Sequence, residues 1–284
     1  MGRGERRRLC RRSEGGSAPP ESMSDRRPIR EGVERAAALR IEHRLGAAPI
    51  RNVPAVIEDL RPDAMVIRRP MPGGPAGALV GMRDRWLLIV NTHERVLREQ
   101  RDMAAHLLGH LLLDSGSRRL QVEHDLFDDG TPAEVRAAAF ATNWLVPVSA
   151  IAACAAAWGL ESWGAEHLAA VSMEYGISVR ALVWQLLHTS TLGEADRRRV
   201  AGTGEASPED TLRLASRMGM SEYVRSGLAA RGAVAWPRRY VALVARAYDR
   251  GDLGRAEVET LLEDDALVRQ VTDLRGRDGS AAGP

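Results

Sequence analysis

Cysteine is nearly absent from this 284-residue sequence, which contains only Cys10 and Cys154 and no C-x-x-C pair. A disulfide framework is therefore not expected, and the cysteine usage is typical of a reducing cytoplasm. Long hydrophobic runs are missing as well, so we expect no membrane-spanning segment. The net charge is only +2, so no global field marks the chain as a nucleic-acid binder. With 44% apolar and 27% charged residues, the composition is that of an ordinary globular protein.

The first 30 residues differ from the rest of the chain. They hold nine arginines and four acidic residues among Gly, Ser and Pro, and they lack the apolar region of a secretory signal. This composition predicts a disordered tail, because it has almost nothing to bury. The tail is either a solvated extension, including the case that translation starts at Met23 and not Met1, or an arm that touches nucleic acid or an acidic partner. Blocks of like charge are usually disordered, which favours the solvated extension.

Apolar periodicity predicts a mostly helical chain with one β region. Helical patterns occur at 31–45, 52–60, 98–113, 131–145, 161–175 and 179–188. Three β-like runs follow one another at 64–70, 78–82 and 86–91, with a turn-rich connector after the first. We therefore expect an α+β fold that is predominantly helical, with a small three-stranded antiparallel sheet and helix 98–113 at its centre.

Composition divides the chain into four parts. They are the arginine-rich tail (1–30), a main domain (31–192), a polar linker that contains glycine (193–208) and a C-terminal helical region (209–284). Within the last part, short helices are predicted at 209–218, 221–230, 237–250 and 255–262, and a loose tail is predicted from 278 onward.

The stretch AAHLLGHLLLD, residues 104–114, places two histidines four residues apart on an apolar helix. One helical turn is 3.6 residues, so His106 and His110 project from the same face and can share one zinc ion. Gly109 lies between them, and the lack of a side chain there would let another element pass close to the helix. The alternative is that both histidines are ordinary core or surface residues.

Glu134 is the best candidate for a third ligand. It lies in the first turn of the next long helix, which Thr131 as N-cap and Pro132 at the first position are predicted to open. Two histidines and a glutamate from a second helix form the ligand set of many zinc peptidases. An acid in the first turn also complements the helix dipole without any metal, so both interpretations stay open.

Two motifs in order resemble the ImmA/IrrE family of zinc metallo-endopeptidases. RDMAAHLLGHLLLD (101–114) is similar to the family's R-x-x-x-A-H-E-L-G-H-L-L-L-H, and EVRAAAFATNWLVP (134–147) is similar to E-x-x-A-[ND]-x-F-A-x-x-[LF]-L-[MV]-P. The likeness covers residues 31–192 well and the remainder weakly. It implies a Zn²⁺ site whose ligands are His106, His110 and Glu134. Some members carry a second acid two places later, where this chain has Arg136.

The main departure from the family pattern is Leu107. In H-E-x-x-H peptidases the glutamate at this position takes a proton from the attacking water and delivers it to the leaving amine, a contribution of ~10²–10⁴-fold. Leucine has no titratable group, so this function would have to come from elsewhere. Asp114 and His124 are conceivable substitutes, and Asp114 could also accept a hydrogen bond from an imidazole.

Three functions follow as hypotheses. The first is a cytoplasmic pseudoenzyme of the ImmA/IrrE type, linked to transcription regulation and stress response, that binds a helix–turn–helix transcription factor without cutting it efficiently. The second is an active zinc endopeptidase with a relocated general base. The third is a DNA-associated regulator that uses the basic tail and the helix pair 166–188, with Arg180, Gln185 and His188 facing bases. The second helix of this pair, 179–188, is mainly apolar, which favours packing in the core over direct DNA binding.

Overall fold

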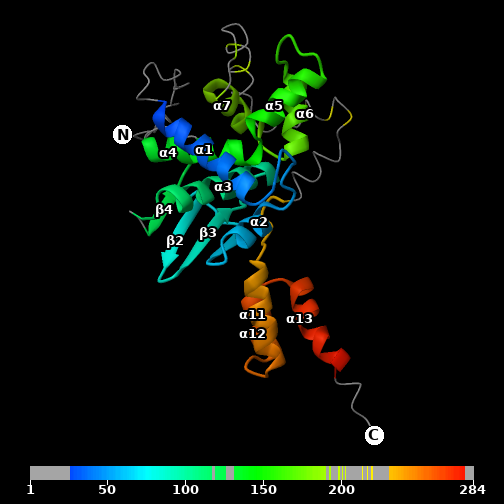
Figure 1. The fold of residues 1–284 in the computed structure, drawn as a ribbon. Helices are drawn as coiled ribbons and strands as arrows, with labels where there is room; N and C mark the ends of the chain where they lie inside the picture. Colours follow the sequence, from blue (N-terminus) through cyan, green and yellow to red (C-terminus); the bar gives the residue numbers. More distant parts are fainter. Residues whose placement is uncertain are drawn as a thin grey trace, which may run out of the picture.

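The computed structural model describes residues 26–116, 119–125, 131–189 and 230–278, with a few single residues between 189 and 230. Its elements, labelled as in Figure 1, are α1 (Arg27–Glu42), α2 (Val53–Leu60), β1 (Ala64–Arg69), β2 (Gly77–Met82), β3 (Arg85–Asn91), α3 (Leu97–Leu113), β4 (Leu120–Glu123), α4 (Pro132–Leu145), α5 (Val148–Ala157), α6 (Ala165–Tyr175), α7 (Val179–Thr189), α11 (Arg238–Asp249), α12 (Arg255–Leu262) and α13 (Asp265–Asp278). The predicted α+β class is confirmed, because helices dominate and pack around one small sheet. Most of the predicted tail, almost all of the linker 193–208 and most of the predicted helices 209–218 and 221–230 lie outside the described residues.

The sheet has four strands in the order β1-β3-β2-β4, and it is mixed. β1 pairs parallel with β3, whereas β2 pairs antiparallel with β3 and with β4. The prediction of a three-stranded antiparallel sheet was therefore wrong in strand number and in the direction of one pair. The run 86–90 in β3 is apolar at every position, which is typical of an inner strand; Leu88 and Val90 on one face are buried, and Leu87 and Ile89 on the other are half-buried. Accordingly, β3 lies in the middle with β1 and β2 on either side.

Helix α3 lies at the centre of the main domain, between the sheet and α4 (Figure 1). All its residues from Met103 to Leu111 are buried. Gly109 faces α4, where a Cβ atom would lie only 3.1 Å from the Cα of Ala137. The expected close passage of another element at this glycine is thus observed, and it brings α4 against the histidine-bearing turn of α3.

The helix that carries Glu134 begins where the sequence predicts. Thr131 caps α4, because its Oγ1 accepts a hydrogen bond from the Glu134 backbone N–H at 3.3 Å. This cap fixes Glu134 in the first turn of α4, directly above the central part of α3. At its other side α4 packs along α1, which begins at Arg27 and therefore includes the last residues assigned to the predicted tail.

The helix pair α6–α7 packs into the main domain. Gln185 is fully buried and donates hydrogen bonds to Asn143 Oδ1 at 3.1 Å and to the Val146 carbonyl at 2.6 Å. His188 stacks on Trp184, whose ring is buried as well. A glutamine with these partners cannot reach a base edge, so the side chains of α7 support packing as the role of this helix.

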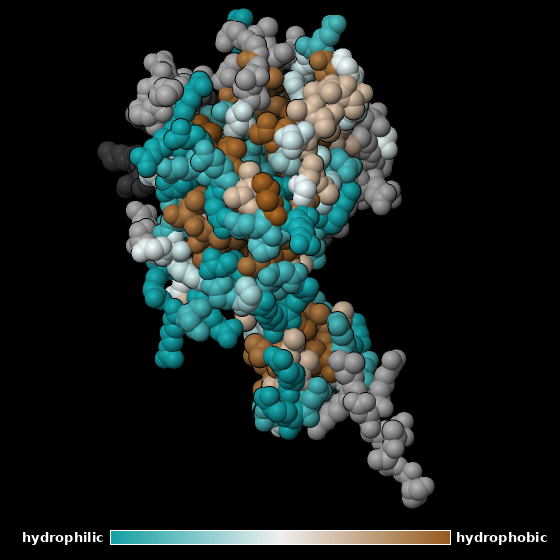
Figure 2. All heavy atoms as spheres, viewed as in Figure 1, coloured by the Kyte–Doolittle hydropathy of each residue, from teal (hydrophilic) through white to brown (hydrophobic). Residues whose placement is uncertain are grey.

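The three C-terminal helices form a separate small core, the C-terminal unit (residues 236–278), in which apolar side chains gather between the helices (Figure 2). The sequence predicted α11 and α12, but it assigned no helix to the region of α13. Arg238 and Arg239 attach this unit to the main domain, since they donate hydrogen bonds to the backbone carbonyls of Ala55, Glu58 and Pro62 in and after α2. Just before them, Ala235 forms an antiparallel bridge with Arg68 at the outer edge of β1.

Within the described ranges, no helix taken alone has the length and apolar composition needed to cross a membrane. The pair α4 and α5 reaches both only when the two helices are joined across their 48° bend. α4 is a core helix here, since all its residues from Ala137 to Leu145 are buried.

Candidate metal centre

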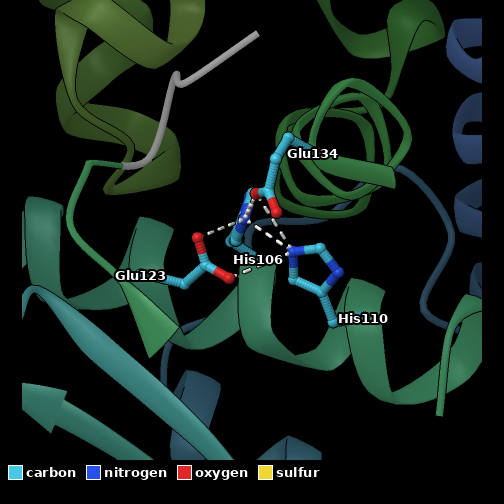
Figure 3. A group of neighbouring side chains, drawn as sticks. All are labelled: His106, His110, Glu123 and Glu134. Atoms are coloured by element: carbon cyan, nitrogen blue, oxygen red, sulfur yellow. Dashed lines mark hydrogen bonds and ion pairs between the residues drawn. The ribbon is translucent and has the colours of Figure 1, made fainter. Parts of the chain in front are cut away.

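The two histidines of α3 point their Nε2 atoms at each other. These atoms lie 3.0 Å apart, and the rings are nearly perpendicular, with an interplanar angle of 77° (Figure 3). His106 is fully buried and His110 is 2% exposed. The i, i+4 spacing that suggested a shared ion thus brings the two Nε2 atoms together. Both can contact a single ion at a point that is buried from solvent.

Glu134 meets both histidines from α4. Its Oε2 atom lies 3.2 Å from His106 Nε2 and 3.3 Å from His110 Nε2. Its other oxygen, Oε1, accepts a hydrogen bond of 2.9 Å from Gln121 Nε2 on β4. Glu134 therefore presents one oxygen to the two nitrogens, and all three metal ligands suggested by the sequence come together in the structure.

Glu123 on β4 is a fourth member of the cluster, and the sequence analysis missed it. Its Oε2 lies 3.7 Å from His106 Nε2, and its Oε1 lies 3.4 Å from His110 Nε2. One ligand atom from each of the four residues fits within 4.8 Å of the others (Figure 3). The sequence signal for it is the alternation in LQVE, which places Gln121 and Glu123 on one face of a strand, but a run of four residues is too short to predict a strand or its partner alone.

The cluster has the dimensions and the donor chemistry of a metal site. Zinc–ligand bonds of about 2.0–2.2 Å at tetrahedral angles place neighbouring ligand atoms about 3.3–3.6 Å apart. The distances from the histidine nitrogens to each other and to the two carboxylates range from 3.0 to 3.7 Å. In addition, two carboxylates and a divalent cation sum to zero charge when both imidazoles are neutral. This buried group can therefore hold a metal ion.

The electrostatics of the metal-free cluster follow from its burial. Burial alone would lower the pKa of His110, but hydrogen bonds to Asp114 and Glu134 outweigh it and raise the pKa to about 9. Burial would raise the pKa of Glu134, but its hydrogen bonds to His106 and His110 dominate and lower it. Without metal, a proton on His110 thus neutralises part of the carboxylate charge, and a bound cation would displace that proton.

The far side of His110 is held by a chain of charged groups. His110 Nδ1 donates to Asp114 Oδ2 at 3.1 Å, and Arg136 donates to the other oxygen of Asp114. Arg136 also donates to Glu31 on α1 at 3.0 Å. The expected hydrogen bond from an imidazole to Asp114 is therefore present. It directs Nε2 of His110 toward the cluster and Asp114 away from it.

Leu107, which stands where the resembled motif has a glutamate, is part of the hydrophobic core. Leu107 is fully buried and packs in the main cluster of apolar side chains. Of the two substitutes considered from the sequence, Asp114 is engaged behind His110, and His124 is exposed beside Glu123. In the described part of the chain, no hydrogen bond or ion pair joins the His124 side chain to the cluster.

Comparison of the sequence with protein-family models gave no match. A search among curated proteins gave none either. The residues themselves and their geometry therefore carry the functional argument.

Proposed function

We propose that this chain is a zinc-binding pseudopeptidase of the ImmA/IrrE type that binds a transcriptional regulator without cutting it efficiently. The carrying observation is the convergence of His106, His110 and Glu134 on one buried point while the fully buried Leu107 occupies the position of the general base. The cluster can hold a metal ion, but the glutamate that would act as general base is replaced by the core residue Leu107.

Zinc is the cation that this donor set favours. Imidazole nitrogens combined with carboxylate oxygens at short, tetrahedral spacing are typical of zinc, whereas magnesium and calcium prefer oxygen ligands alone. When bound in a peptidase, zinc acts as a Lewis acid that polarises a carbonyl and activates water. In this chain, His106, His110 and Glu134 would hold the ion, and Asp114 would orient the ring of His110.

The lack of a base at position 107 is what separates this proposal from an ordinary peptidase. A general base must lie within hydrogen-bond reach of the proton that it removes. Leu107 has no such group, and Asp114 is occupied by His110 and Arg136. Without the general base, the rate of peptide hydrolysis should fall by about 10²–10⁴-fold. Binding of a protein partner is then the function that we propose for the fold.

The proposed partner is a helix–turn–helix transcription factor, as the family resemblance implies. The experiment mixes the zinc-loaded chain with the small helix–turn–helix protein encoded nearest to it. We expect a stable complex on size exclusion and an intact partner after prolonged incubation. Rapid cleavage by the natural protein, abolished by a chelator, would contradict the pseudopeptidase.

Two variants at one position sharpen this experiment. Leu107→Glu should gain measurable hydrolysis of the partner, whereas Leu107→Gln should not, because it places a polar group of the same size there without a titratable proton. Both changes put a polar group into the core and are expected to lose similar stability. Zinc content near that of the natural protein would show that the variants remain folded.

Glu123 favours one alternative function, an active zinc endopeptidase with a relocated general base. Its carboxylate lies 3.7 and 3.4 Å from the Nε2 atoms of His106 and His110, whereas Asp114 contacts only Nδ1 of His110, on the side away from the cluster. In that case Glu123→Gln would abolish the cleavage shown by the natural protein while zinc stays bound.

A further inference from the structure

We propose that Glu123 is a direct fourth ligand of the metal, so that the ion occupies a closed site and fastens strand β4 to helices α3 and α4. The inference rests on the proposed function only in taking the cluster to bind metal. A closed site with four protein ligands is the mark of a structural metal centre, whereas catalytic centres keep one position open.

Glu123 lies at ligand distance from both histidines. Its Oε2 lies 3.7 Å from His106 Nε2 and its Oε1 lies 3.4 Å from His110 Nε2, whereas Glu134 presents one oxygen, Oε2, to the same atoms at 3.2 and 3.3 Å. Neighbouring ligand atoms of a tetrahedral zinc ion are about 3.3–3.6 Å apart, so each carboxylate lies where a ligand of the same ion would lie. A base that acts through an intervening water would lie farther out, by about the 2.7 Å of a hydrogen bond.

Glu123 is a buried carboxylate whose charge only the two histidines compensate among the described residues. The Glu123 side chain is 4% exposed, and its Oε1 atom is buried without a hydrogen bond. Among the described residues, its carboxylate pairs with the two imidazoles and with no arginine or lysine. A buried carboxylate is costly unless a charge or donor compensates it, and a cation between the four residues would do so.

Strand β4 is oriented with its polar side chains toward the metal centre. This strand exposes its apolar side chains, with Leu120 60% and Val122 42% exposed, and turns its polar residues Gln121 and Glu123 toward the cluster. The arrangement is the reverse of what the hydrophobic effect favours. Gln121 holds Glu134, and Glu123 meets the histidines, so contacts to the metal site account for the reversed strand.

The experiment uses the full-length chain loaded with Co²⁺, a spectroscopic substitute for zinc, and azide as a small competing ligand. A closed site has no position for azide, so we expect the visible spectrum of the natural protein to stay unchanged when azide is added. This measurement uses the natural protein alone and needs no variant. A spectrum that shifts with azide would show an open position and would overturn the inference.

Affinity for Zn²⁺, measured by competition with a chelator, supplies the second readout. Changes in groups that only support a ligand cost about 10–100-fold in metal affinity. For Glu123→Gln we expect a loss greater than about 100-fold, together with a cobalt spectrum that now responds to azide. A loss of about 100-fold or less would overturn direct ligation.

The matched control is Glu58→Gln, which alters another buried carboxylate, 2% exposed, outside the cluster. It should keep the natural metal affinity and azide response, so a defect confined to Glu123→Gln reports on the site. Zinc binding that persists with an open position would refute only the role of Glu123. If the natural protein and His106→Ala contain the same amount of metal, both this inference and the proposed function would be overturned.

Discussion

At the scale of single residues, His110 is oriented by a chain of contacts that leads away from the metal centre. Asp114 accepts its Nδ1–H, and Arg136 holds Asp114 in turn. The carboxylate is shared between an imidazole and a guanidinium, and these two bonds outweigh burial and lower the pKa of Asp114. Asp114 therefore stays ionised and accepts the Nδ1–H of His110, which leaves His110 Nε2 available to bind the cation.

We predict that Asp114→Asn weakens zinc binding by about 10–100-fold, the range for groups that support a metal ligand. The amide is a weaker acceptor for His110 Nδ1 and loses the charge that Arg136 binds. Chelator competition measures the change, and Asp125→Asn, at an exposed acid 51% accessible, is the control. An unchanged affinity in Asp114→Asn would show that the orientation of His110 does not depend on this contact.

Asp102 is a buried acid one helical turn before His106. Its Oδ2 accepts the Ser178 N–H at the start of α7, and its Oδ1 has no hydrogen bond. Burial raises the pKa of Asp102 to about 7. The folded state therefore binds this proton more tightly than the unfolded state, whose value is near 3.8, and stability falls as the pH rises from about 4 to about 7.

We predict that Asp102→Asn removes this pH dependence. Relative to the natural protein, the variant should gain about 1 kcal/mol at pH 4.5 and up to about 4 kcal/mol at pH 8, at about 1.4 kcal/mol per pKa unit. Urea unfolding at the two pH values measures the difference. A gap between the two proteins that does not change with pH would contradict the raised pKa.

Three of the four cluster residues could be predicted from the sequence, for a physical reason. His106 and His110 are local to one helix, so their common face follows from the helical repeat. Glu134 lies at a helix start that Thr131 and Pro132 mark clearly. Glu123 reaches the site through strand pairing with β2, a non-local contact that no spacing in the sequence specifies.

At the scale of elements, α1 and α4 pack closely through Gly32. A Cβ atom there would collide with the Arg136 carbonyl and lie 2.8 Å from the Phe140 backbone nitrogen. Neither backbone atom can move without moving α4, the helix that carries Glu134. The contact therefore sets the distance between two helices and, through α4, the position of a metal ligand.

We predict that Gly32→Ala destabilises the protein by about 1–3 kcal/mol, the usual cost of overpacking, despite the roughly 1 kcal/mol that alanine gains over glycine within a helix. Glu34→Ala, at a side chain 69% exposed on the same helix, should change stability by less than about 0.5 kcal/mol. Thermal unfolding distinguishes the two. A stabilised Gly32→Ala protein would show that α1 can shift freely.

The sheet shows where sequence patterns end. The three longer strands were visible as apolar runs, but an apolar run does not specify its partner, so the predicted antiparallel sheet missed the parallel pairing of β1 with β3. β4 has only four residues and turns its apolar side chains outward. Pairing with β2 stabilises this strand. Alternation of polar and apolar residues over four positions is too weak a signal to predict it from the sequence.

At the scale of the whole molecule, a metal bound by α3, β4 and α4 would join segments that lie up to 28 positions apart along the chain. We predict that free zinc at 100 times the dissociation constant stabilises the natural protein by about 2.7 kcal/mol and raises its unfolding temperature. His106→Ala should show no such rise. Equal shifts in both proteins would indicate binding elsewhere.

The C-terminal unit is attached through a few contacts at α2 and β1. We predict that replacing Arg238 and Arg239 with alanine increases hydrogen exchange in α11 to α13, because the contacts to α2 are lost. Zinc content should stay unchanged, since neither arginine belongs to the cluster. Exchange that is unaltered in the double variant would show that other contacts hold the unit.

The chain of contacts behind His110 has an evolutionary consequence. Glu31, Arg136 and Asp114 come from α1, from α4 and from the end of α3, yet each depends on the charge of the next. Loss of the arginine alone would remove the charge that links Asp114 to Glu31, while Glu31 would keep its ion pair with Arg27 and Asp114 its bond to His110. Descendants of this sequence should therefore exchange the three positions together, as a correlated set.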